Sequence, residues 1–153
     1  MHPPAPVRST DYLVVESTYG DAVHPEADPE DLLEDVICRT VQRCGTVIVP
    51  TFAVGRAQSL LYHLSRLNKS GRIPPVPVYL DSPMAIDASD LFCRQDGGAR
   101  LSRQEARAAC SVAQYIRDAE LSERIIADPQ PKIVLSASGM ATGGRVLNYL
   151  KRY

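Results

Sequence analysis

Tryptophan is absent from the 153-residue sequence, and aromatic residues make up only 6% of it. So few rings argue against a broad base-stacking surface of the kind used by single-strand-binding proteins. The formal net charge of −1 excludes a strongly basic nucleic-acid binder, although it leaves room for a local basic cleft. No apolar run approaches the length of a membrane span, and the N-terminus has no apolar signal-peptide core. We therefore expect a cytoplasmic protein with no membrane partner.

Cysteine patterns that bind metal are also missing. The four cysteines are Cys38, Cys44, Cys93 and Cys110, and no two of them have the two-residue spacing of a zinc knuckle. Cys38 and Cys110 fall on apolar helix faces, where a buried free thiol is the usual state. The cysteines thus indicate a reduced protein with no metal site in this chain.

Short apolar runs alternate with helical patterns along the chain. The strand-like runs cover residues 11–18, 46–49, 76–80 and 132–136. Helices are predicted over residues 29–43, 56–69, 84–93, 103–113 and 145–153, with short helical turns over 115–127 and a flexible lead-in over 1–10. This alternation predicts an α/β fold, a Rossmann-like and mainly parallel sheet flanked by helices.

Each predicted strand runs into small or polar residues. Glu16 ends the first strand, Ser82 follows the third, and Arg56 stands just beyond the second. Because the carboxyl ends of parallel strands lie at one edge of a sheet, these side chains are predicted to share one polar rim.

Residues 45–59 form a strand, a turn at Gly55 and a helix that begins with Arg56. A helix N-terminus offers unpaired backbone N–H groups, and a cation beside them favours an anion. An ordinary connection with a solvated arginine is the alternative, and this stretch alone does not decide between the two.

Residues 136–144 are the strongest candidate for a phosphate cradle, because their glycines permit close approach of the backbone between a strand and a helix. The segment lacks the lysine of a Walker A motif and a full dinucleotide-binding fingerprint. Anion binding and a structural turn both remain open. The candidate residues are Ser136, Ser138, Gly139, Met140, Gly143 and Gly144.

Three segments together resemble one family. Residues 13–21 with His24, residues 48–58 and residues 136–145 are similar to the motifs of the β-CASP subfamily of metallo-β-lactamase-fold nucleases, and residues 79–85 fit its bacterial type. This subfamily includes bacterial and archaeal RNA nucleases and the endonuclease of pre-mRNA 3′-end processing. The resemblance runs from Tyr12 onward.

The resemblance implies roles for individual residues. Glu16 matches a catalytic acid that hydrogen-bonds a histidine near the metal centre. Arg56, Ser82 and residues 136–144 match segments that face single-stranded RNA. Two zinc ions, held by a metallo-β-lactamase domain, are expected to activate a water molecule for attack on the phosphodiester, and the β-CASP domain forms a lid over them.

The sequence departs from the family pattern in what it leaves out. The His-x-His-x-Asp-His metal motif and the later histidine motifs are absent, and Ala22 stands where relatives often have arginine. Residues 11–20 are therefore expected to belong to the metallo-β-lactamase domain, and residues 21–153 to an incomplete β-CASP domain. The chain alone is expected neither to bind catalytic zinc nor to cleave RNA.

Two other interpretations remain. One is a Rossmann-like module that binds a nucleotide or small anion without any nuclease role. The other is a structural fragment that assembles through exposed sheet edges, for example as a homodimer.

Overall fold

The structure is a computed structural model that describes residues 5–23, 26–94 and 101–153, so His24 lies outside the described residues. Its helices are α1 (Pro29–Gln42), α2 (Arg56–Lys69), α3 (Pro83–Arg94), α4 (Arg103–Ser111), α5 (Ala119–Ala127) and α6 (Val146–Arg152). Its strands are β1 (Thr46–Pro50), β2 (Val78–Asp81), β3 (Gln114–Tyr115) and β4 (Lys132–Ser136).

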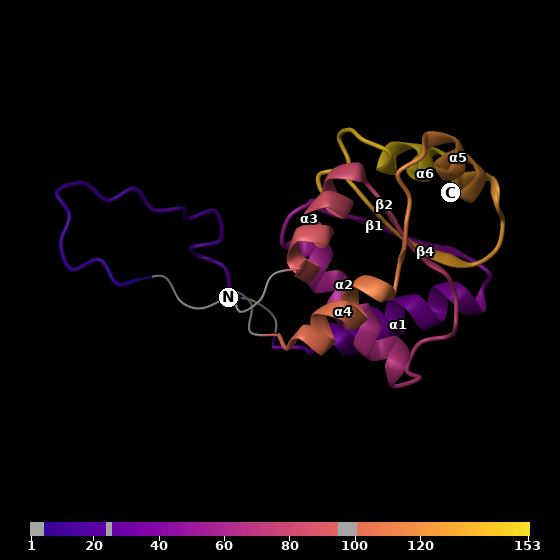
Figure 1. Cartoon of the computed structure of the whole chain (residues 1–153), viewed down its shortest axis with the longest axis horizontal. Coiled ribbons are helices and arrows are strands. Elements are labelled where there is room, and N and C mark those ends of the chain that lie inside the picture. Colours follow the sequence, from indigo (N-terminus) through magenta and orange to yellow (C-terminus); the bar gives the residue numbers. More distant parts are fainter. Residues whose placement is uncertain (1–4, 24–25, 95–100) are drawn as a thin grey trace.

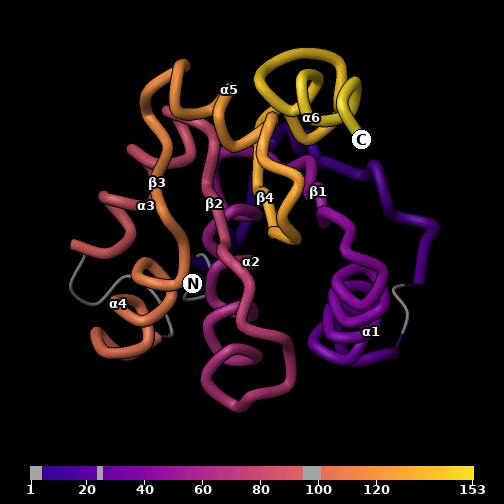
Figure 2. The backbone as a smooth tube through the Cα atoms, turned by 90° about the vertical axis from the view of Figure 1, so that its right-hand side faces the viewer, coloured from indigo at the N-terminus to yellow at the C-terminus, as the bar shows by residue number. Residues whose placement is uncertain are grey.

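The four strands form one parallel sheet in the order β1-β4-β2-β3 (Figure 2). Strand β4 lies in the middle, where Leu135 is in register with Val49 of β1 on one side and Leu80 of β2 on the other. All five residues of β4 are buried, as expected for a strand covered on both faces. The predicted α/β architecture with a parallel sheet is confirmed.

Helices cover both faces of the sheet (Figure 1). Ile133 and Leu135 of β4 join the larger core, which includes apolar residues of α1, α2, α3 and α4. Val134 points the other way and packs in a second cluster with Ile125 of α5 and Tyr149 of α6. The alternation of side chains along a strand therefore divides the core into two layers.

Local sequence signals set the helix starts. Asp28 caps α1 by accepting a hydrogen bond from the Glu30 N–H, with Pro29 as the first helical residue. Ser102 and Glu105 form the capping box of α4, and hydrogen bonds from Ser102 lower the pKa of the Glu105 carboxyl.

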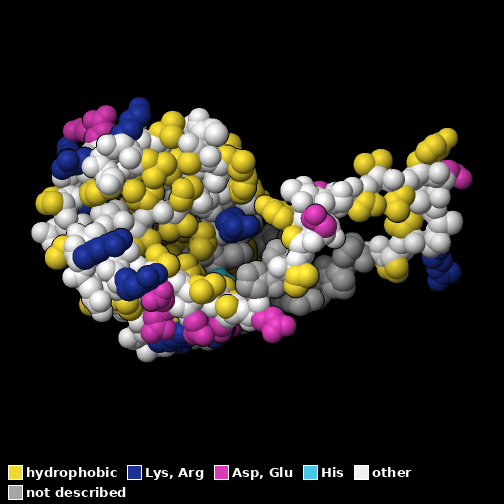
Figure 3. All heavy atoms as spheres, turned by 180° about the vertical axis from the view of Figure 1, so that it is seen from behind, with side chains coloured by type: hydrophobic (Ala, Val, Ile, Leu, Met, Phe, Trp, Pro, Cys, Tyr) yellow, Lys and Arg dark blue, Asp and Glu magenta, His cyan; other side chains and the backbone are white. Residues whose placement is uncertain are grey.

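The predicted strand over residues 11–18 is wrong. Residues 5–23 form an extended arm that leaves the body of the protein (Figure 1), and Figure 3 shows hydrophobic patches along it among polar and charged groups. Val14 is 98% exposed and Leu13 is 77% exposed. A strand needs a neighbour for its backbone groups, and the described sheet takes its four strands from other segments.

Two further expectations are corrected. Residues 115–127, predicted as helical turns, begin in the short edge strand β3 before α5 starts. Cys110, expected to be a free thiol, is joined to Cys93 in a disulfide between α4 and α3. Its sulfur faces the neighbouring helix, which the pattern of α4 alone could not reveal.

Candidate functional site

A crevice is expected where the chain leaves neighbouring strands toward opposite faces of a parallel sheet. Strand β1 leads into α2, which packs in the larger core, whereas the adjacent β4 leads into α6, which packs in the second cluster. The segments after β1 and β4 therefore lead to helices on opposite faces of the sheet, although the two loops pack together where Gly139 meets Phe52. The carboxyl ends of β1, β2 and β4 lie at one edge of the sheet, as predicted for the polar rim.

The loop after β1 is held in place by a buried glutamine. Gly55, with φ of 80°, precedes α2 and donates its N–H to the Gln58 side-chain oxygen at 2.7 Å. The Gln58 amide in turn donates to Ser89 Oγ at 2.9 Å. Gln58 is only 7% exposed, and it follows Arg56 by two residues, so this anchor fixes the start of the helix that carries the cation.

Arg56 itself is exposed at the first position of α2. Its guanidinium makes no hydrogen bond or ion pair within residues 5–23, 26–94 and 101–153. Several other arginines, such as Arg72 and Arg117, are paired with carboxylates. Arg56 is thus a cation with its donors available at the carboxyl edge of the sheet.

The loop after β4 folds tightly against the loop after β1. A Cβ on Gly139 would lie 2.9 Å from both Cδ2 and the backbone nitrogen of Phe52. Gly144 has a φ of 74°, a conformation that favours glycine. Ser138 Oγ is buried with no hydrogen-bond partner in the described part of the chain. The loop therefore combines close backbone approach with an unsatisfied hydroxyl.

Ser82 and Ser136 use their hydroxyls inside the fold. Ser82 Oγ accepts the Ala85 N–H at 3.3 Å near the start of α3, and Ser136 Oγ donates to the Asp81 carbonyl at 2.9 Å. Both are almost fully buried. They shape the rim, whereas Met140 at the tip of the glycine loop is 69% exposed.

Asp81, whose carboxylate is buried at the end of β2, was not among the predicted site residues. It accepts hydrogen bonds from Arg145 at 2.7 Å, from the Tyr149 hydroxyl at 2.8 Å and from the Ser122 hydroxyl. Burial, followed by the bond to Asp81, raises the pKa of Tyr149, so its hydroxyl remains a donor at neutral pH. The signal was present as an acid at the end of an apolar strand.

Arg145 connects this cluster to the glycine loop. It follows Gly144 directly and also donates to the carbonyls of Ile116 and Arg117, at 3.1 and 2.8 Å. The guanidinium therefore lies across the ends of β2 and β3. These bonds anchor the end of the glycine loop, and the guanidinium occupies the rim beside β2 and β3.

Glu16 does not reach the rim, which corrects the prediction that it shares one with Arg56. It lies on the exposed arm, where its carboxylate accepts the Thr18 N–H at 2.8 Å. Hydrogen bonds from the Thr18 side chain and then its backbone lower the pKa of Glu16.

A metal centre needs several acid, histidine or cysteine side chains close together, and such side chains occur throughout residues 5–23, 26–94 and 101–153. No three of them lie together in a group that could hold an ion. The described residues therefore do not fit a zinc centre, and no chemical step is derived through one.

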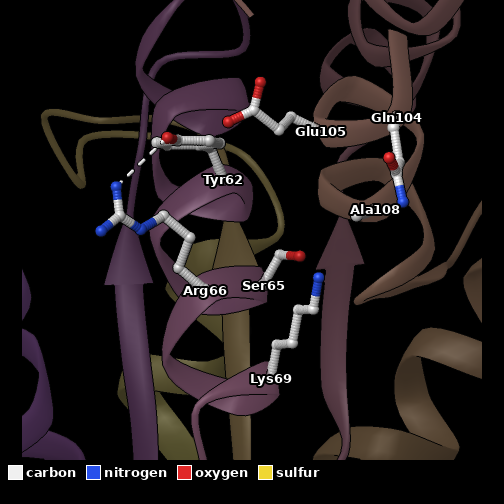
Figure 4. Close-up of a pocket in the computed structure, with 7 residues that line it drawn as sticks. All are labelled: Tyr62, Ser65, Arg66, Lys69, Gln104, Glu105 and Ala108. Atoms are coloured by element: carbon white, nitrogen blue, oxygen red, sulfur yellow. Dashed lines mark hydrogen bonds between the residues drawn. The ribbon is translucent and has the colours of Figure 1, made fainter. Parts of the chain in front are cut away.

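A second hollow, with a volume of about 280 Å³, lies between α2 and α4. Figure 4 shows Lys69 extending toward α4, whereas the Arg66 guanidinium turns to the Tyr62 hydroxyl. Arg66 also pairs with Glu30 at 3.0 Å. The hollow lies along the middle and end of α2, away from Arg56, and one of its two cations is already neutralised.

Comparisons with known proteins agree on one family. A model of the Beta-Casp domain matches residues 57–153. Ribonuclease TTHA0252 of Thermus thermophilus is 34% identical over 148 residues, which cover 92% of this chain and 34% of that protein. Transcription termination factor FttA of Methanosarcina mazei is 33% identical over 150 residues, which cover 92% of this chain and 24% of that protein.

The RNase J-like protein of Methanocaldococcus jannaschii is 31% identical over 144 residues, covering 92% of this chain and 34% of that protein. This chain therefore spans about a third of the length of these relatives, or less.

Gly139→Ala tests the close packing of the two loops. The added methyl group would collide with the Phe52 ring and backbone, so we expect the free energy of unfolding to fall by about 1–3 kcal/mol. Gly143→Ala is the matched control, because nothing lies within 4 Å of its added Cβ. Urea unfolding followed by circular dichroism measures both. Equal losses in the two variants would contradict the packing argument.

Tyr149→Phe tests the Asp81 cluster. The change removes one donor from a fully buried carboxylate, and we expect the free energy of unfolding to fall by about 1–3 kcal/mol. Tyr12→Phe, on a side chain that is 90% exposed, should leave stability unchanged. Thermal and urea unfolding report both effects. A Tyr149 variant as stable as the natural chain would show that the hydroxyl is dispensable.

Proposed function

The chain belongs to the Beta-Casp domain family, and from this membership we propose that it is the RNA-clamping lid of a zinc-dependent, metallo-β-lactamase-fold ribonuclease. The full-length protein would hydrolyse phosphodiester bonds during RNA processing or decay. Its two zinc ions would supply the activated water, and their ligands would come from a metallo-β-lactamase domain outside this chain. The lid would hold single-stranded RNA over that centre.

The observation that carries this proposal is the exposed Arg56, which has no partner among the described residues and begins α2 directly after the loop that packs on the glycine loop. A phosphate there would receive donors from the guanidinium and from backbone N–H groups of the loop. The buried hydroxyl of Ser138, which has no partner among the described residues, would gain an acceptor. The names of the relatives include two ribonucleases.

The remaining residues would have supporting roles in the same site. Gly139, Gly143 and Gly144 would let the RNA backbone approach the loop, with Met140 exposed at its tip. Ser82 and Ser136 would fix the shape of the rim through their internal hydrogen bonds.

The arm is proposed to complete a second domain. Residues 11–20 would join the metallo-β-lactamase domain of the full-length protein, and residues 21–153 would form the β-CASP domain. Tyr12, Leu13 and Val14 are 77–98% exposed, and apolar side chains of this size are normally covered by protein. Docking of the arm would also bring Glu16 to the histidine that it is proposed to orient in catalysis.

The cell compartment is proposed to be the cytoplasm, and a homodimer is a further proposed state. Among the described helices, none has both the length and the apolar character needed to cross a bilayer.

A nucleotide- or anion-binding module without any nuclease role is the second candidate. The opening of neighbouring loops to opposite faces of the sheet favours it, because nucleotides also bind at such crevices. A thermal shift with mononucleotides but not with single-stranded RNA would select this alternative.

Arg56→Gln should weaken binding of single-stranded RNA about fivefold, since one charge-assisted phosphate contact contributes about 1 kcal/mol. The slope of log K against log salt concentration should also become shallower by about 0.7. Fluorescence anisotropy with a labelled oligoribonucleotide at several salt concentrations measures both quantities. Arg39→Gln is the control: it removes the same charge from α1, where Arg39 pairs with Asp35. Equal effects of the two variants would point to net charge alone.

The 153-residue chain should not cleave RNA when zinc is added, because its described residues form no metal site. Incubation of an end-labelled oligoribonucleotide with the purified chain, with zinc or with a chelator, should give identical gels. Zinc-dependent cleavage that copurifies with the chain and disappears with the chelator would overturn this expectation.

A further inference from the structure

We propose that Phe52 is a base-stacking platform in the loop after β1 and holds the base of the nucleotide whose phosphate Arg56 binds, an inference that rests on the proposed function. Phe52 lies in the loop after β1 and is 54% exposed. It is one of only two phenylalanines in the chain. A single ring is enough for this role even though the sequence is poor in aromatic residues.

The loop after β4 holds the ring in place. The ring edge lies against the backbone of Gly139, where an added Cβ would be 2.9 Å from Cδ2 and 3.1 Å from Cε2. The Phe52 carbonyl accepts the Ala57 N–H at 3.3 Å, which connects its backbone to the first turn of α2. The ring is therefore supported on one side and half-exposed on the other.

The surroundings of the ring suit a nucleotide. Arg56 lies four residues after Phe52, at the first position of α2, so the cation and the ring come from one short segment of the chain. Val54 and Met140, which are 71% and 69% exposed, add apolar surface in the same two loops. A nucleotide carries phosphate and base on one ribose, and an aromatic ring contributes about 1–3 kcal/mol by stacking on a base of any sequence.

The other side of the rim is closed to a base. Arg145 lies across the ends of β2 and β3 and is bonded to Asp81, Ile116 and Arg117. The exposed part of Phe52 therefore lies on the side of the rim away from Arg145, on the loop after β1.

Phe52→Trp provides a direct test, because the natural chain contains no tryptophan. The new indole would be the sole tryptophan fluorophore. Titration with a ten-nucleotide oligoadenylate should quench its emission, whereas an abasic ribose-phosphate oligomer of the same length should not. Equal emission with both oligomers at saturation would overturn the proposal.

Phe52→Leu and Phe52→Tyr separate stacking from simple packing. Leucine keeps apolar contact with Gly139 but has no ring, so affinity for oligoadenylate should fall about 5- to 100-fold, whereas tyrosine should stay within about twofold. Affinity for the abasic oligomer should be the same in all three chains. Phe92→Leu, the same change at the half-buried second phenylalanine on α3, is the matched control.

The outcomes distinguish base stacking by Phe52 from the proposed RNA-clamping function. If the natural chain binds oligoadenylate and the Phe52→Leu variant binds it with the same affinity, stacking is overturned and RNA clamping is left intact. An equal loss for the abasic oligomer would show that Phe52 only shapes the loop, and would overturn stacking as well. A natural chain that binds neither oligomer would overturn the proposed function together with this inference.

Discussion

Strand β4 is buried along its whole length between β1 and β2, and this position constrains everything at the carboxyl edge of the sheet. Its two neighbours lead into α2 and α3, which pack on one face, so the helix after β4 must cover the other. The loop that makes this change of side has to turn sharply past the loop after β1. Glycine at 139 and 144 is what allows such a turn, since a Cβ at either position would collide with neighbouring atoms.

The buried carboxylate of Asp81 at the end of β2 determines which arginine at this edge is bound inside the fold. A carboxylate as buried as Asp81 is tolerated only with several donors, and Arg145 and Tyr149 supply two of them. Because Arg145 is thereby drawn across β2 and β3, it is not available to a ligand. Arg56 has no such acid among the described residues, so the free cation lies on the opposite side of the glycine loop. Arg145 thus neutralises the buried Asp81, whereas Arg56 keeps its donors available for a ligand.

Sequence reasoning succeeded where the signal was local and failed where it depended on tertiary neighbours. The bounds of α2 and β4 follow from helical periodicity, Gly55 and a run of β-branched residues, and the structure has both as expected. Strand β3 is defined by its pairing with Tyr79 and Leu80 of β2, which no local pattern records. The importance of Asp81 and Phe52 also depends on partners far along the chain. Residues 11–18 show the converse: a strand-like pattern stays extended and exposed without a neighbour in the described sheet.

The two exposed features of this chain require different kinds of partner. Val14 and Leu13 on the arm present apolar surface, and burial of each against protein would contribute about 1.5–3 kcal/mol. The crevice presents a free guanidinium, backbone donors and one ring, a combination that gains most from an anion attached to a flat base. A protein surface that covered Arg56 without a matching acid would have to desolvate a charge. Apolar surface on the arm, and an exposed cation and ring in the segment after β1, are therefore the features on which the proposed RNA-clamping function depends.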